Sequence, residues 1–414
     1  MKSIFSRDFT LMIVGQIVSM FGNSILRFAL SLYVLDITGS SAVFGGVLAL
    51  SMLPTILLSP VGGVIADRVP RAKVMYVLDF LTAGLILVFD LVGRSGSIVP
   101  TAALLLCLAA IQACYQPATQ SAVPLLTPTE SLTQANGVVM QVYSLSNLLG
   151  PIAGGALYGF FGLGPICAVS GACFLASAVM ECFLHIPFAP QKTKGGVKSA
   201  LLDLRDAGKF LVGTKLVPLL TVVAGVNLFL SSLYVVGLPY YVKIYLGLSS
   251  QLYSFVEASM GLGTILGAVL TGILGQKLSF GRSWRYLGAS VLSLAVICLA
   301  TVSPAAPMAS WLALLLAALL GMACAALFSV LAQSFLQRVT PVPLLGKVGS
   351  FVTAASTCAM PLGQGMYGLL LEWLPAWLVP LLGLAACVPL VLVAKKALAW
   401  HVEENSSSAC INEG

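Results

Sequence analysis

Long apolar runs, separated by short polar or turn-forming breaks, dominate the pattern along this chain. A helix needs ~20 apolar residues to cross the hydrocarbon core of a bilayer, because each residue adds about 1.5 Å of length. The pattern therefore predicts an all-α membrane protein with twelve spans. The predicted spans are 9–34, 42–66, 74–93, 99–123, 137–160, 164–186, 216–240, 251–275, 284–303, 309–335, 348–371 and 376–396.

The connections between the predicted spans are short, with one exception at residues 187–215. Within this segment, residues 201–211 mix apolar and charged positions in a way that is typical of an amphipathic helix lying on a membrane. The pattern divides the chain into four parts. These are a six-helix bundle at 1–186, a cytoplasmic linker with an amphipathic helix at 187–215, a second six-helix bundle at 216–397 and a cytoplasmic tail at 398–414.

Two sequence features recur about 210 residues apart, which indicates an internal repeat. Residues 62–68 have their counterpart in residues 271–277, and residues 150–155 have theirs in residues 360–365. Repeated halves joined by a long central loop are typical of transporters whose substrate site lies near the bilayer midplane, between the halves.

Charge and composition narrow the class further. Only 8% of the residues are charged and 59% are hydrophobic, whereas an ordinary soluble domain carries about 25% charged residues. With the N-terminus inside, eighteen Lys and Arg residues fall on the cytoplasmic side and two fall outside. This asymmetry predicts a multi-pass protein of the cell membrane with both termini in the cytoplasm. It also explains the net charge of +7 without a nucleic-acid partner.

No constellation for enzymatic chemistry is readable. The ten cysteines are scattered and the two histidines lie far apart, so we expect neither a zinc site nor a disulfide framework. A phosphate-binding loop of the ATP-hydrolysing type does not occur in the sequence. We therefore expect no cofactor, no metal, no catalytic residues and no transport driven by ATP hydrolysis.

The residues after the second span resemble the signature of the major facilitator superfamily, G-x-L-A-D-R-x-G-R-K. Pro70 replaces a glycine of this pattern, and Lys73 is displaced by one position. Asp67, at the end of a helix, is suited to pair with basic residues or a helix N-terminus and so hold one conformation; a purely topogenic loop is the alternative. The expected conformational motif is Gly63, Asp67, Arg68 and Arg71.

The fifth span resembles the antiporter signature of exporters in this superfamily. Ser146 stands where the second glycine of the signature is expected. Glycine and proline here bend and thin a helix, which lets neighbouring helices approach closely; ordinary small-residue packing is the alternative. The matching residues are Gly137, Gly150, Pro151, Gly154 and Gly155.

Residues 116–126 and 132–137, with 15–19 and 38–40, are similar to the branch that contains macrolide efflux pumps and the enterobactin exporter. The resemblance implies a major facilitator fold and a monomer that exports a small amphiphilic molecule by proton antiport. The alternatives are a facilitator or importer, a lysolipid flippase and a transporter-fold sensor that does not translocate. An intramembrane enzyme is a distant further alternative.

Polar residues inside the predicted spans are candidates for substrate or proton binding, because they are costly in lipid. Four residues of the first span share one helix face by their spacing, and three glutamines of the fourth span repeat every four residues. Glu257 is expected to carry a coupling proton or contact a cationic substrate, with Arg27 as its charge partner or as an anion contact; a structural pair is the alternative. The candidates are Gln16, Asn23, Arg27, Gln112, Gln116, Gln120, Asn227, Glu257 and Gln333.

Five other acidic residues lie near predicted span ends, where we expect them to face water or lipid headgroups. They are Asp36, Asp79, Asp90, Glu130 and Glu181.

Overall fold

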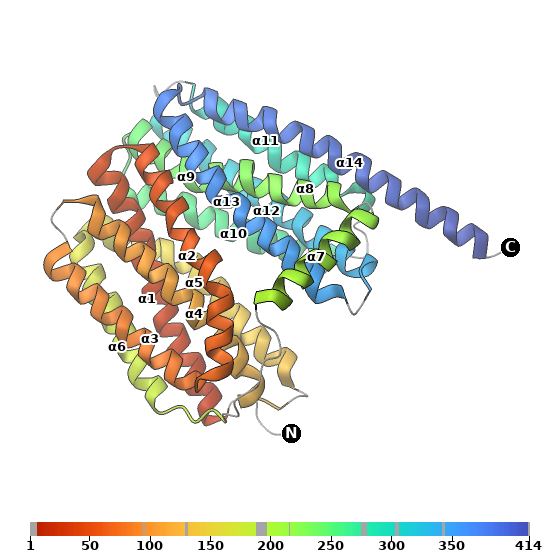
Figure 1. The fold of residues 1–414 in the computed structure, drawn as a ribbon. Helices are drawn as coiled ribbons and strands as arrows, with labels where there is room; N and C mark the ends of the chain where they lie inside the picture. Colours follow the sequence, from red (N-terminus) through yellow and green to blue (C-terminus); the bar gives the residue numbers. More distant parts are fainter. Residues whose placement is uncertain are drawn as a thin grey trace. The chain divides into compact units, whose positions relative to one another are not determined.

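The computed structural model of the chain describes residues 6–93, 96–128, 131–187, 197–214, 216–274, 280–302, 306–341 and 344–412. The chain divides into two units, which we describe separately (Figure 1). Unit 1 consists of residues 1–196 and 249–254, and unit 2 consists of residues 197–248 and 255–414. All regular structure in the described ranges is helical.

Unit 1 contains six long helices. They are α1 (Arg7–Thr38), α2 (Ser41–Arg68), α3 (Arg71–Val88, continued by a π-helical turn at Phe89–Gly93), α4 (Ile98–Leu126), α5 (Leu132–Phe161) and α6 (Leu163–Cys182). The break between α1 and α2 follows from local chemistry. Gly39 takes the left-handed conformation that ends α1, with φ of 62°, and the Ser40 side chain then caps the first turn of α2.

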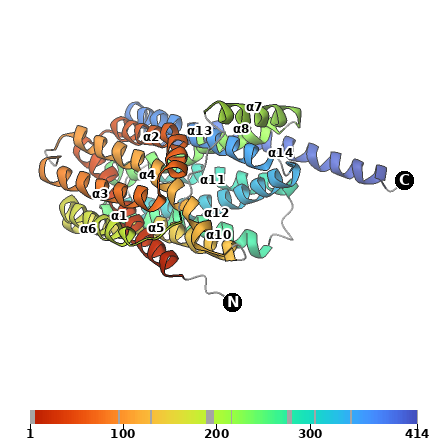
Figure 2. The same cartoon turned by 60° about the horizontal axis from the view of Figure 1, so that its bottom comes forward.

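Helix α1 packs along α6 in both views (Figures 1 and 2), and it also contacts α5 and α4. Helix α3 packs on α6, and α2 packs on α4. Small residues permit these close approaches: Gly22 of α1 faces Cys173 and Ser170 of α6, and Gly62 of α2 faces the backbone of α4 at Ala113. The interior of unit 1 therefore lies among α1, α3, α4 and α6.

Unit 2 begins with the short helix α7 (Val197–Gly213). The next helix runs from Val217 to Tyr245, as α8 (Val217–Gly225), a π-helical stretch (Val226–Ser231), α9 (Ser232–Pro239) and a second π-helical stretch (Tyr240–Tyr245). The remaining helices are α10 (Ser250–Leu274), α11 (Trp284–Ala300), α12 (Pro307–Val339), α13 (Leu345–Trp373) and α14 (Leu378–Asn412). Helix α11 packs on α12 and α14, and α13 packs along α8 and α9.

Among the described residues, nine helices are long and apolar enough to cross a membrane. The other three predicted spans correspond to α5, α11 and α13. Helix α11 is shorter, with 17 residues, whereas α5 and α13 are long enough but richer in glycine and polar residues. The predicted all-helical membrane architecture is confirmed. Helix α14 runs well past the predicted end of the last span, through Asn412 (Figure 1).

The placement of α7 differs from the expectation of a helix that offers its apolar face to lipid. Ala207 and Leu211 of α7 are buried against Leu336 of α12 and Val348 of α13. At the polar edge of this contact, Lys347 Nζ lies 3.0 Å from Asp206 Oδ2. The hydrogen bond and the positive charge of Lys347 hold the pKa of Asp206 below its ordinary value. Part of the apolar face of α7 is thus used for docking within unit 2.

Candidate functional site

A small polar cavity lies inside unit 1, among α1, α3, α4 and α6. Of its ionisable lining residues, Asp79 and Tyr115 are both buried. The cavity volume is about 20 Å³, which is room for about one ordered water and too little for a drug-sized solute. Its lining residues are Ser19, Met20, Asn23, Asp79, Thr82, Leu108, Ile111, Gln112, Tyr115 and Phe174.

The polar face predicted on α1 contributes to this cavity in part. Asn23 lines it, together with Ser19, and Gln16 is 1% exposed with no hydrogen-bond partner for its Oε1 among the described residues. Arg27 is half-buried further along the same face. Because Arg27 belongs to unit 1 and Glu257 to unit 2, their pairing stays a prediction.

The three glutamines of α4 have different surroundings. Gln112 lines the cavity, and the half-buried Gln116 lies within reach of the Tyr143 hydroxyl on α5. Gln120 is exposed. The four-residue spacing predicted that the three glutamines share one polar face of α4. Neighbouring helices cover only Gln112 and Gln116 of these three.

Two of the acidic residues expected at solvated span ends are buried instead, so that expectation was wrong for them. Asp79 of α3 is 2% exposed and Glu181 of α6 is 0% exposed. The Tyr115 hydroxyl on α4 donates a hydrogen bond of 2.6 Å to Glu181 Oε1. By contrast, Asp36 is exposed as expected and accepts a hydrogen bond of 2.8 Å from the Tyr158 hydroxyl. Glu130 lies outside the described residues.

A signal for this buried pair was present in the sequence. Ser170, Ser177 and Glu181 follow spacings of seven and four in an otherwise apolar stretch, so they share one face of α6. All three are buried. A polar face with small side chains on an apolar helix indicates contact with other helices rather than with headgroups.

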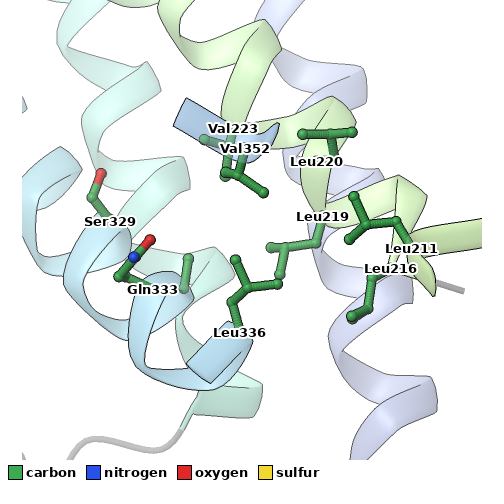
Figure 3. A pocket seen from close by; sticks show the side chains of 10 residues that line it. Leu211, Leu216, Leu219, Leu220, Val223, Ser329, Gln333, Leu336 and Val352 are labelled. Carbon is green, nitrogen blue, oxygen red and sulfur yellow. The ribbon is translucent and has the colours of Figure 1, made fainter. Parts of the chain in front are cut away.

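Unit 2 contains a different kind of pocket, among the end of α7, α8, α12 and α13 (Figure 3). Its cavity volume is about 100 Å³, and leucine and valine side chains form most of its wall. Gln333 and Ser329 of α12 are the polar side chains that line it. An apolar wall with few polar groups suits the apolar part of an amphiphile, and the polar pair can orient it.

The other predicted polar residues of unit 2 are positioned by their helices. Asn227 lies in the first π-helical stretch, and its Nδ2 donates a hydrogen bond of 3.0 Å to the Val223 carbonyl of the preceding turn. Glu257 is half-buried in the second turn of α10. The role predicted for Glu257 stays a prediction.

In the loop motif between α2 and α3, the close approach to α4 is made by Gly62, whereas Gly63 has no side-chain or backbone neighbour within 4 Å of an added Cβ. Arg71 begins α3 and its Nε donates a hydrogen bond of 2.9 Å to Ser121 Oγ on α4. Asp67 is half-buried and Arg68 is exposed. The motif therefore ties α3 to α4 through Arg71.

The glycines of α5 face α1. An added Cβ at Gly150 would collide with Ser24, and one at Gly154 would come within 3.1 Å of the Ile25 carbonyl oxygen. An added Cβ at Gly155 would collide with Ser254, at the start of α10, and would come within 3.2 Å of Phe28, while Gly137 has no neighbour within 4 Å of an added Cβ. Pro151 lies inside the helix. Three of the predicted glycines thus permit contact between helices, which is the physical role expected of them.

Comparisons with known proteins agree with this architecture. The sequence profile of the Major Facilitator Superfamily matches residues 12–363 and 220–408. Macrolide efflux protein A of Streptococcus pyogenes is 24% identical over 352 residues, which cover 84% of this chain and 85% of that protein. Macrolide efflux protein A of Enterococcus faecalis is 23% identical over 76% of this chain and 96% of its own length.

Solved structures share the fold. A bacterial homologue of the iron transporter ferroportin, in its inward-facing state, has a TM-score of 0.70 at 20% identity and covers 95% of this chain and 98% of its own. The nucleoside transporter NupG has a TM-score of 0.69 at 12% identity and covers 95% and 99%. The chain is therefore a multi-pass membrane transporter that belongs to the Major Facilitator Superfamily.

Proposed function

We propose that this transporter exports a small amphiphilic molecule of the drug, macrolide or siderophore type in exchange for protons. The observation that carries the proposal is the similarity to macrolide efflux proteins over 84% of the chain. Transport then proceeds by alternating access, with the halves exposing a site to one side of the membrane at a time. The proposed setting is a monomer in the cell membrane with both termini in the cytoplasm.

The unit 2 pocket supports an amphiphilic solute. Its wall is formed mainly by apolar side chains such as Leu219, Val223 and Leu336, with Gln333 as a polar contact (Figure 3). Burial of an apolar solute surface supplies affinity of about 25 cal/mol per Å² before the entropy costs of binding. A hydrogen bond to Gln333 would select among solutes of similar size.

Transport by purified protein in liposomes under an imposed pH gradient tests the proposal. Lipophilic cations, a macrolide such as erythromycin, siderophores and lysolipids are screened in parallel, with protein-free liposomes as the control. The proposal predicts that a gradient accelerates the flux of at least one amphiphile. Flux that is indifferent to the gradient would favour a facilitator or a lysolipid flippase, and binding without flux would favour a sensor.

The same assay tests the role predicted for Glu257. If this residue carries the coupling proton, Glu257→Gln removes the acceleration by the gradient. If coupling is normal in Glu257→Gln, the proton site lies elsewhere in the chain, and the buried carboxyl groups of unit 1 become the candidates.

A further inference from the structure

Two carboxyl groups lie close together in the interior of unit 1, away from the residues that helix periodicity singles out. Asp79 projects from α3 and Glu181 from α6, and both are more than nine-tenths buried. They are near enough for their charges to repel each other. Among the described residues, neither forms an ion pair with a lysine or arginine.

The hydrogen-bond donors around the pair are too few for two ionised carboxylates. Tyr115 donates to Glu181 Oε1 at 2.6 Å, a length typical of a hydroxyl bound to a charged acceptor. Glu181 Oε2 and Asp79 Oδ2 are buried and have no partner among the described residues. A second negative charge would therefore have no cation beside it and no protein donor for these two oxygens.

The surroundings of Asp79 favour a protonated carboxyl group. Ser177 of α6 lies beside Asp79, and its hydroxyl donates a hydrogen bond of 3.0 Å to the Gly15 carbonyl of α1. Since a serine hydroxyl has one hydrogen, Ser177 is left to act toward Asp79 as an acceptor. A protonated Asp79 can donate to Ser177, whereas an ionised Asp79 receives no hydrogen from Ser177 while that hydroxyl is bonded to Gly15.

Two buried carboxylates without a cation repel each other and lose their hydration, so such pairs hold a shared proton. We infer that Asp79 and Glu181 together bind one proton, and that this site couples proton entry to solute exit. The second part of the inference rests on the proposed function, whereas the first does not. In the arrangement described, Glu181 carries the negative charge and Asp79 carries the proton.

The other ionisable groups near the pair do not change this balance. Tyr115 on α4 is a donor to Glu181, and the polar side chains of α1 that line the same cavity, Ser19 and Asn23, carry no charge. Arg27 lies two turns beyond Ser19 on α1, about 12 Å along the helix axis. The charge of the cluster is therefore set by the two carboxyl groups.

The cavity offers a route by which a proton can reach the carboxyl pair, and the contact with α1 lets the charge of the pair affect helix packing. Asp79 and Tyr115 both line the cavity, whose room for about one water is enough to relay a proton past Ser19, Asn23 and Gln112. Gly15 of α1 lies against Glu181, because an added Cβ would be 3.7 Å from Glu181 Cγ. Loss of the proton would leave two charges beside α1, and their repulsion would favour a different packing of α1 on α6.

The proton site is tested by infrared spectroscopy of the purified full-length chain at neutral pH. The carbonyl band of a protonated carboxyl group should be present in the wild type and absent in Asp79→Asn. The control variant is Asp36→Asn, which removes an exposed carboxyl group and should leave the band unchanged. Absence of the band in the wild type, or its persistence in Asp79→Asn, would overturn the inference. So would its removal by added sodium or calcium ions, since a bound cation would then replace the proton.

Coupling is tested in the liposome assay with Asp79→Asn and Glu181→Gln. Glutamine at 181 keeps an acceptor for Tyr115, and asparagine at 79 keeps a donor toward Ser177, so both variants retain the hydrogen bonds of the fold. Solute exchange without a gradient should continue, and acceleration by a pH gradient should disappear. A purely structural role would lower both rates together and contradict the coupling. If the wild type moves no solute, the proposed function fails, but the infrared result still decides the proton site.

Discussion

The polar interiors of the two units differ in charge although their helices follow the same order. In unit 1 the interior holds Asp79, Glu181 and Tyr115, with two carboxylate oxygens unpartnered among the described residues. In unit 2 the Tyr234 hydroxyl pairs with Ser293 and donates to the Ala317 carbonyl at 3.2 Å. By the repeat spacing of about 210 residues, the position in unit 2 that corresponds to Glu181 is Val391, which is uncharged.

Unit 2 also contains buried polar atoms without a partner among the described residues, but all of them belong to neutral groups. They are the Ser283 Oγ, the Thr340 Oγ1, the Gln364 Oε1 and the Tyr367 hydroxyl. A neutral hydroxyl cluster fixes helix packing at any pH between acid and base extremes. A carboxyl pair instead changes its charge when a proton binds or leaves. The two helix bundles are thus similar in architecture but differ in their interiors. Unit 1 contains a carboxyl pair that can bind and release a proton, and unit 2 contains the apolar pocket.

The largest effect on transport is expected at a feature that both units share, the glycines at contacts between helices. Gly150 faces Ser24 in unit 1, and Gly363 faces Ser232 and the Leu228 carbonyl in unit 2. Valine at either position overpacks the contact, at a cost of about 1–3 kcal/mol or more, and should abolish transport. Flux and thermal unfolding of Gly150→Val and Gly363→Val measure this. The control is Gly84→Ala, since an added Cβ at Gly84 has no neighbour within 4 Å. Normal transport by both valine variants would show that neither contact is tight.

The second-largest effect is expected from replacing the buried tyrosines, and it should differ between the two units. Tyr115→Phe removes a hydrogen bond to a charged carboxylate, worth about 1.5–3 kcal/mol, whereas Tyr234→Phe removes bonds to neutral groups, worth about 1 kcal/mol. Tyr115→Phe should therefore lower the unfolding temperature more, and it alone should weaken acceleration by a pH gradient. Equal effects of the two variants on coupling would remove the functional difference between the units.

A smaller effect is expected at the unit 2 pocket. Gln333→Leu removes a polar contact worth about 1.4 kcal/mol, so the affinity for a solute that hydrogen-bonds there should fall about tenfold. The pH dependence of flux should stay unchanged, because Gln333 does not titrate. Gln134→Leu, at an exposed position of α5, makes the same chemical change outside the pocket. The pocket is not the solute site if KM is unaltered in Gln333→Leu.

The smallest effect concerns the docking of α7. The pKa of Asp206 is lowered in the folded state, so its contact with Lys347 contributes stability above the unfolded-state pKa of about 4 and loses it as the pH falls below that value. Asp206→Asn should lower the unfolding temperature slightly at neutral pH, and the difference should vanish in acid. A difference that persists in acid would mean that the charge of Asp206 does not matter.

Much of the fold was predictable because lipid imposes long apolar runs. The spans and the repeat were predicted from composition and spacing, and the small residues of α5 from the resemblance to an exporter signature. The π-helical stretches around Asn227 were not predicted, because an extra residue in a helical turn leaves no mark on apolar composition.

The candidate site was predicted only in part. Spacing placed Asn23 and Gln112 on helix faces that do meet at a cavity. Asp79 and Glu181 were misjudged because their distance from a span end was taken as a measure of exposure, whereas burial depends on which helices cross there. Which helices cross at a given residue is decided by tertiary packing, and the sequence of a single helix does not reveal it.

If the carboxyl pair of unit 1 couples transport to protons, protons and solute must move together. Both can be counted at once with a pH-sensitive dye inside liposomes loaded with the best solute of the screen. We expect solute movement in the wild type to drive proton movement in the opposite direction, and Asp79→Asn to move solute without protons. Undiminished proton movement in Asp79→Asn, or solute movement without protons in the wild type, would show that the pair does not couple transport.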